Sequence, residues 1–171
     1  MSTAVIMTAR KALELFWSIF PTTIKKKPCL PSWTEWQRAR PDLALVTRWH
    51  GTYHPPSWAV VTGDISGIVI LDFDGFKGLH LLTELGLEPH LMTGSGGAHV
   101  YFAHPGYAVK TLNGKSTPGL ARLFPGLDIR GDGGYAVFFG RNTDGPYTWL
   151  REPDLYDFNL LPNALQQLIR K

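Results

Sequence analysis

The sequence lacks the features of a secreted, disulfide-bonded or membrane-spanning protein. It contains one cysteine, Cys29, so no internal disulfide can form. No stretch approaches the roughly 18 consecutive apolar residues that a membrane helix needs. The chain begins without the apolar run and small-residue cleavage site of a secretion signal. We therefore expect a cytoplasmic protein with no membrane partner.

Length and composition favour one folded domain. The 171 residues, 44% of them hydrophobic, suffice for one well-buried domain but are too few for two independent enzymes. Internal repeats and low-complexity tracts are missing as well. We treat residues 1–171 as a single domain, with room for two small lobes whose boundary the sequence does not define. All candidate residues are accordingly assigned to one site.

Basic residues slightly outnumber acidic ones, 17 to 14, which gives a formal net charge of +3. This balance is compatible with a polyanionic partner but does not require one. A lysine cluster at 25–27 precedes a stretch, 33–49, in which three arginines lie among three tryptophans. Such interleaving suits phosphate contacts combined with base stacking. The alternative is that the tryptophans belong to the core and the basic residues to its solvated rim.

Hydrophobic spacing predicts a mixture of helices and short strands. An amphipathic helix is expected over 7–20, ended by Pro21, and a second short helix over 41–49. Further helices are expected over 78–87, where Gly86 would stop the helix, and over 162–169. Glycine-separated runs of β-branched and aromatic residues predict strands over 58–63, 67–74, 99–102 and 135–140. The predicted class is α+β, or mixed α/β, around a small sheet.

Two aspartates lie at the end of one predicted buried strand. Asp72 and Asp74 follow the apolar run 68–71, and the period of two along a strand points both carboxylates to one face. Two like charges on one face repel unless a cation lies between them, and carboxylate oxygens are preferred by Mg²⁺ and Mn²⁺. The alternative is that these aspartates only serve a turn at the strand end.

A glycine-rich turn leads directly into another predicted strand at 93–102. Its backbone N–H groups at Gly96 and Gly97, with the Ser95 hydroxyl, are suited to bind phosphate oxygens. His99 begins the strand and can add a charge-assisted hydrogen bond. The alternative is a plain hairpin turn, with His99 hydrogen-bonded to a core carbonyl.

A third carboxylate follows the proline-glycine turn at 125–126. Asp128 and Arg130 together fit a site for a metal ion and a triphosphate. Two alternatives remain at this stage: Asp128 and Arg130 pair only with each other at the surface, or Asp132 is the functional acid instead.

Three segments, in order, carry a family resemblance: SGIVILDFD at 66–74, TGSGGAHVYF at 93–102 and PGLDIRGDGGY at 125–135. Together they resemble the N-terminal bifunctional primase-polymerase domains of the archaeo-eukaryotic primase superfamily, found in plasmid, phage and mobile-element replication proteins. The lead-in, KKP at 26–28 and AVVTGDISG at 59–67, is also similar, so the resemblance spans about residues 10–149. It implies an α/β lobe packed against a lobe with an RNA-recognition-motif-like sheet, with the active site in the cleft between them.

The resemblance also implies roles for individual residues. Asp72 and Asp74 would be a metal-ligand pair and Asp128 a third metal ligand, while Ser95 and His99 would contact the triphosphate. The sequence departs from the family after the third segment, where Phe-Gly-Arg at 139–141 stands in place of a frequent proline-serine pair.

The implied activity is that of a DNA primase and polymerase with two Mg²⁺ or Mn²⁺ ions as cofactors. The implied partners are a DNA template and primer, nucleoside triphosphates, and a helicase or helical initiation domain in the same polypeptide. Lys27 and Arg130 are candidates for additional phosphate binding. Replacing Asp72 or Asp74 with alanine is expected to abolish incorporation without unfolding the protein.

Two other functions compete with this interpretation. ILDFDG at 70–75 also matches the start of haloacid-dehalogenase-like phosphatases, but Phe76 and Lys77 follow where those enzymes usually have threonine or valine. The second alternative is a catalytically weak nucleotide- or DNA-binding module of a larger replication protein. The intact acids argue against such a loss of activity.

Overall fold

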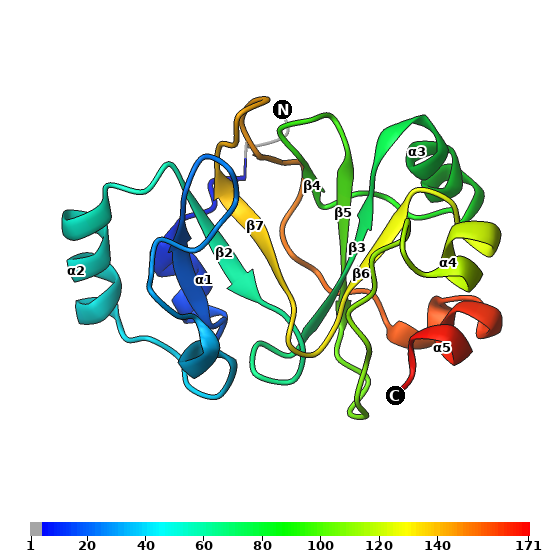
Figure 1. Ribbon diagram of the computed structural model, residues 1–171, viewed down its shortest axis with the longest axis horizontal. Helices are drawn as coiled ribbons and strands as arrows, with labels where there is room; N and C mark the ends of the chain where they lie inside the picture. The colour runs from blue at the N-terminus through cyan, green and yellow to red at the C-terminus, as the bar shows by residue number, and fades with distance from the viewer. Residues whose placement is uncertain (1–4) are drawn as a thin grey trace.

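The computed structural model describes residues 5–171, which form two antiparallel sheets with helices on their outer sides (Figure 1). The elements follow one another as α1 (Ala9–Glu14), β1 (Ile19–Thr22), η1 (Thr34–Gln37), α2 (Leu43–Tyr53), β2 (Ser57–Val61), β3 (Ile68–Phe73), α3 (Gly75–Glu84), β4 (Leu91–Met92), β5 (Ala98–Ala103), α4 (Pro118–Leu123), β6 (Leu127–Arg130), β7 (Tyr135–Gly140), β8 (Thr148–Trp149), η2 (Phe158–Leu160) and α5 (Asn163–Ile169). The α+β class predicted from the sequence is confirmed.

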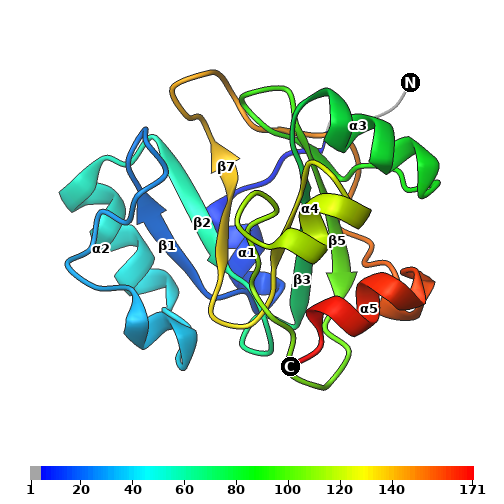
Figure 2. The ribbon, with the colours of Figure 1, turned by 45° about the vertical axis from the view of Figure 1, so that its right-hand side comes forward.

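The larger sheet has five strands in the order β6-β3-β5-β4-β8, and the smaller has three in the order β1-β2-β7. All strand pairs in both sheets are antiparallel. From β3 to β6 the chain runs strand, helix, strand, strand, helix, strand, which is the ferredoxin-like order. Figure 2 shows α3, α4 and α5 on the side of this sheet that faces away from β1 and β2.

Strand β3, which pairs with both β5 and β6, contributes to two cores. Val69 and Leu71 pack into the cluster that includes residues of α3, α4 and α5. Ile68 and Ile70 pack into the other cluster, which fills the space toward the three-stranded sheet. Because side chains alternate along a strand, Asp72 continues the face of Ile68 and Ile70. The acid therefore emerges where the core between the two sheets ends.

Aromatic contacts fix the two sheets against each other. Trp17 stacks on Tyr101 of β5, with ring centroids 5.6 Å apart and planes within 6°. Trp149 of β8 donates its indole N–H to the carbonyl of Phe138 in β7, at 2.7 Å. Buried aromatic pairs of this kind contribute beyond the area they bury. These contacts hold the two sheets together near the end of β3 that carries Asp72.

The helix predicted over 7–20 is wrong in its second half. The helix ends at Glu14, and Phe16 adopts the left-handed conformation, with φ of +61°. The next residues form β1, in which Ile19 and Phe20 are fully buried and pair with β2. Pairing with a distant strand satisfies the backbone and buries both side chains, which outweighs the local helical spacing.

The other predicted helices and strands are present, with shifted ends. The helix predicted at 41–49 is α2, whose N-terminus is capped by the Asp42 carboxylate accepting from the N–H of Leu45 at 2.8 Å. The prediction over 78–87 corresponds to α3, which begins directly after Asp74. The sequence analysis missed the short elements β4, α4, β6 and β8. Of these, β6 matters most because it carries Asp128.

Candidate active site

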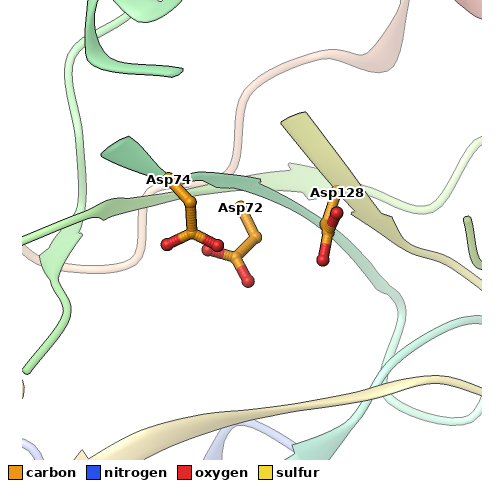
Figure 3. A group of neighbouring side chains, drawn as sticks. All are labelled: Asp72, Asp74 and Asp128. Atoms are coloured by element: carbon orange, nitrogen blue, oxygen red, sulfur yellow. The ribbon is translucent and has the colours of Figure 1, made fainter. Parts of the chain in front are cut away.

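Strands β3 and β6 bring three carboxylates together at one end of the larger sheet. Asp72 and Asp128 are direct cross-strand partners, and Asp74 follows two residues after Asp72. Each of the three offers one oxygen, and these oxygens lie within 4.8 Å of one another. Figure 3 shows the three carboxylates on the same side of the ribbon. The same-face arrangement expected for Asp72 and Asp74 is therefore present.

The start of α3 is held tightly against the turn that precedes β6. The N–H of Asp74 donates to the carbonyl of Gly126 at 2.8 Å. Gly126 has a φ of +80°, and a Cβ there would lie 2.4 Å from the backbone nitrogen of Gly78. Only glycine permits both this backbone conformation and this approach. The close contact positions Asp74 relative to Asp128.

Asp72 is buried beside the side chains of Arg130 and His99. Its Oδ2 lies 3.4 Å from Nη2 of Arg130, and its Oδ1 lies 3.3 Å from Nε2 of His99. Burial raises the pKa of the Asp72 carboxyl, but attraction to His99 and Arg130 outweighs burial and holds the pKa below its usual range. Asp72 is therefore ionised at neutral pH.

Asp74 has the opposite electrostatic character. Partial burial and repulsion from Asp72 and Asp128 raise the pKa of its carboxyl above the usual value, only partly offset by His99 and Lys26. The positive groups near Asp74 therefore do not balance the negative charges of its two neighbouring acids. A cation placed among the three acids would remove this repulsion.

The chemistry of the donor set fits a divalent metal ion. Carboxylate oxygens are the ligands that Mg²⁺ and Mn²⁺ prefer. In addition, Oδ1 of Asp72 is buried and lies 3.3 Å from Nε2 of His99, but it receives no well-directed hydrogen bond from the described residues. A buried acceptor without a partner is costly, so an ion at this oxygen would satisfy it.

Arg130 is bonded to both acids that lie on paired strands. Its Nη2 donates to Oδ2 of Asp128 at 2.9 Å and also reaches Asp72. The pairing of Asp128 with Arg130 considered from the sequence is real, but it lies in the cluster and not at an isolated surface position. Asp132 accepts bonds from His104 and from the N–H groups of Val109 and Asp64, and therefore holds loops together elsewhere.

The glycine-rich turn between β4 and β5 packs on the end of β3. The N–H of Thr93 donates to the carbonyl of Gly97, and Gly96 has a φ of +85°. A Cβ on Gly97 would lie 2.7 Å from the carbonyl oxygen of Phe73 and 2.8 Å from Oδ1 of Asp74. The turn therefore approaches the acids closely because it lacks side chains here. Ser95 is exposed at its tip.

His99 forms part of the floor of the site. It is the cross-strand partner of Asp72, it is buried, and its Nδ1 has no hydrogen-bond partner within residues 5–171. Tyr147, which the sequence analysis missed, lies beside it with ring centroids 6.2 Å apart. Burial raises the pKa of Tyr147 to about 12, so its hydroxyl stays protonated. Its chain position, outside every recognised motif, offered no signal.

A cavity of about 810 Å³ joins these groups. Its lining includes the three acids, His99, Arg130, Thr93, Ser95, Tyr147 and Lys26. An adjoining cavity of about 390 Å³ shares Asp72, His99 and Arg130 and adds Lys25 and Lys27. Lys26 lines both cavities, whereas Lys27 lines only the adjoining one. Of the lysines at 25–27, only Lys26 lines the cavity that contains all three acids, and Lys27, the candidate from the sequence, lines the adjoining cavity.

The tryptophans between the basic residues belong to the core. Trp49 is buried and meets Trp36 edge-on, with ring centroids 5.0 Å apart. Trp33 stacks on Phe20 at 5.5 Å, although its edge also lines the adjoining cavity. The packing interpretation is confirmed for Trp49, which is buried, while Trp36 is partly buried and packs against the same core.

The comparisons with known proteins give one clear result. The family model described as "Bifunctional DNA primase/polymerase, N-terminal" matches residues 9–164. A comparison with curated proteins found no match. Within residues 5–171, every helix is too short or too polar to cross a membrane.

Proposed function

Because the chain belongs to the bifunctional DNA primase/polymerase family, we propose that its cleft adds nucleotides to a primer or dinucleotide on a DNA template, with Mg²⁺ or Mn²⁺ held by Asp72, Asp74 and Asp128. Family membership makes the chain a primase/polymerase-type nucleotidyltransferase domain, with DNA and nucleotides as its substrates. The observation that carries the residue assignment is the convergence of the three carboxylates, whose oxygens lie within 4.8 Å of one another.

In this proposal the protein supplies position and charge. Two ions held by the acids would lower the pKa of the attacking 3′ hydroxyl and neutralise the leaving pyrophosphate. In this proposal the triphosphate contacts the Ser95 hydroxyl at the tip of the turn and the His99 side chain, which both line the cavity. The N–H of Gly96 is less suited to this role, because it donates to the carbonyl of Thr93 at 3.0 Å. Lys26 extends into the same cavity and Lys27 into the adjoining one, where each can contact phosphate.

Arg130 has two roles in this proposal, one toward the acids and one toward the substrate. Its guanidinium neutralises Asp72 and Asp128 when the cluster holds no cation. Because its side chain is partly exposed in the cavity, it can turn from the acids to a phosphate oxygen of the substrate. We propose that Arg130 exchanges a carboxylate partner for a phosphate partner as the site fills.

Primer extension tests the proposal directly. A labelled primer on a DNA template is incubated with each nucleotide set and with Mg²⁺ or Mn²⁺, using the wild type, Asp74→Asn and Asp64→Asn. Asp64 is a matched control because its side chain is 92% exposed outside the cavity. Metal-dependent extension that is lost only in Asp74→Asn supports the proposal. Nucleotide or DNA binding without extension in the wild type would favour a catalytically weak binding module.

A haloacid-dehalogenase-like phosphatase is no longer a competing assignment. The family match spans the strand with the two acids, together with both later motifs. No feature of the cavity separately favours phosphate-ester hydrolysis.

A further inference from the structure

Phe76 is an exposed aromatic ring at the edge of the active-site cavity. It lies in the first turn of α3, two residues after Asp74, and its side chain lines the cavity. At 86% exposure it is the most exposed of the large hydrophobic residues in the described chain. A single exposed apolar side chain is ordinary on a surface. Phe76, however, lines the same cavity as the acid cluster.

Two lysines flank this part of the cavity. Lys77 follows Phe76 on α3, and Lys115 comes from the loop between β5 and α4. The loop with Lys115 is tied to the acid cluster, since the N–H of Gly114 donates to Oδ1 of Asp128 at 2.7 Å. Across residues 5–171, no side chain caps the N-terminus of α3, so its first-turn N–H groups also remain available to phosphate.

The cavity therefore has two sides with the acids between them. Along the sheet the order is Asp128 on β6, Asp72 on β3 and His99 on β5, with the glycine-rich turn beyond β5. The lysine loop joins the β6 end of this row through Asp128. The start of α3 is held at the same end by its contact with Gly126. The lysine loop and the start of α3 therefore contact the β6 end of the row, whereas the turn proposed for the triphosphate leads into β5.

The geometry of nucleotidyl transfer gives this separation a meaning. The attacking 3′ hydroxyl forms a bond to the α-phosphorus as the bond to the leaving pyrophosphate breaks, and the two oxygens are roughly in line. If the triphosphate lies on the side of Ser95 and His99, the hydroxyl must approach from the Asp128 side. This step rests on the function proposed above.

We propose that Phe76, Lys77 and Lys115 form the seat for the primer strand, with the Phe76 ring stacked on a base close to the 3′ end. The two ammonium groups contact the backbone phosphates of the same strand. Every base has a π face, so stacking on phenylalanine tolerates any sequence. Lysine contacts to phosphate are also independent of sequence. Both properties are required where each newly added nucleotide must be accepted as the next primer end.

The first experiment compares Phe76→Ala, Phe76→Trp and Leu160→Ala. Leu160 is a matched control because it is 65% exposed and lies outside the cavity. Affinity for a labelled primer-template is measured by fluorescence anisotropy without nucleotide, and KM is measured separately for primer and nucleotide. We expect Phe76→Ala to raise the Kd for primed DNA and the KM for primer by about tenfold, as for one lost base-aromatic stack. Phe76→Trp should restore both, and Leu160→Ala should change neither.

A second arm identifies the strand that contacts the ring. An abasic site close to the 3′ end of the primer should weaken binding by the wild type but add little to the loss in Phe76→Ala, because one contact is removed from either side. An abasic site in the template should weaken both proteins equally. If the template lesion shows the coupling, or if Phe76→Ala raises the KM for nucleotide alone, the primer seat is refuted.

The lysines are tested through salt dependence. Lys77→Ala and Lys115→Ala should each reduce the slope of log Kd against log salt by about 0.7 to 0.9, while Arg48→Ala, exposed on α2, should leave the slope unchanged. Unchanged slopes in both lysine variants would overturn their part of the proposal. The anisotropy arms do not need catalysis. If the wild type bound primed DNA through Phe76 but extended no primer, the proposed function would fail and the primer seat would stand.

Discussion

Replacing Asp74 with asparagine should stabilise the metal-free protein and abolish its response to divalent metal ions. The folded protein disfavours the ionised form of this carboxyl, because partial burial and the charges of Asp72 and Asp128 raise its pKa. Asparagine keeps the shape and removes the charge. It also removes one of the three oxygen ligands that the proposed metal site requires. Stability without metal and affinity for metal should therefore change in opposite directions.

The size of the stabilisation follows from the spacing of the acids. Two unit charges 4.8 Å apart, the outer limit of the cluster, repel by about 1 kcal/mol in water and about 3 kcal/mol at an effective dielectric constant of about 20. Although neighbouring groups partly desolvate its carboxyl, the Asp74 side chain stays open to solvent, and salt screens such charges, so the lower value applies. We expect Asp74→Asn to gain about 1 kcal/mol in EDTA.

Asp72→Asn should have the opposite sign. The pKa of the Asp72 carboxyl is lowered in the folded protein, so its charge is stabilising above the usual pKa and this contribution is lost as the pH falls below it. Losing the contact with Arg130 should cost about 1 kcal/mol, since Arg130 keeps Asp128. From the sequence alone, Asp72→Ala and Asp74→Ala were both expected to leave the fold intact, whereas the structure predicts effects of opposite sign on stability at the two positions.

The assay is urea denaturation followed by tryptophan fluorescence, in EDTA and in Mn²⁺. Wild type should be stabilised by Mn²⁺, and both variants should lose that stabilisation. The advantage of Asp74→Asn in EDTA should shrink as the pH falls through the raised pKa, because the wild-type carboxyl then becomes neutral too. A loss of stability in EDTA for Asp74→Asn, or undiminished stabilisation by Mn²⁺, would refute the reasoning.

Three further predictions concern the frame around the site. Burial lowers the pKa of His90 from 6.5 to about 4, so as the pH falls the unfolded chain binds a proton at His90 before the folded protein does. The free energy of unfolding should therefore fall by up to about 3 kcal/mol between pH 6.5 and about pH 4. An equally steep fall in His90→Gln, measured by urea denaturation, would contradict this. Gly97→Ala should weaken Mn²⁺ binding in calorimetry by tenfold or more, because its Cβ would displace Asp74, whereas Gly51→Ala, with no described atom within 4 Å, should not. Trp149→Phe loses a 2.7 Å bond to the β7 carbonyl and should lower the free energy of unfolding by about 1 to 2 kcal/mol; an unchanged urea midpoint would show that this bond does not hold the sheets together.

Local features of the sequence sufficed to predict the centre of the site. The apolar run before Asp72 predicted a buried strand, and the period of two placed Asp74 on the same face, as observed. Glycines at 96 and 97 predicted a turn without side chains, and this turn packs directly on Asp74. These inferences succeed because the residues that determine each feature are neighbours in the chain. The order of the motifs, being a property of the sequence, also predicted the family.

Contacts between distant segments were decided only by the tertiary structure. The register of β6 against β3 places Asp128 opposite Asp72 and draws Arg130 into the cluster, but no residue near Asp128 encodes that register. The turn with φ of +64° at Lys26 determines which lysine lines both cavities. The strand β1 replaced a predicted helix because its partner, β2, lies about 40 residues away in the chain.

The exposure of Phe76 was likewise decided by the tertiary structure. In the sequence it is one apolar residue after an acidic motif, and helical spacing alone cannot say whether such a residue faces the core or the solvent. Its exposure follows from the direction in which α3 leaves β3, which is set by the close packing of Gly78 on Gly126. The sequence by itself determined which chemical groups are available and which elements carry them. The tertiary structure decided which groups meet, because strand register and helix packing depend on free energies summed over contacts between residues far apart in the chain.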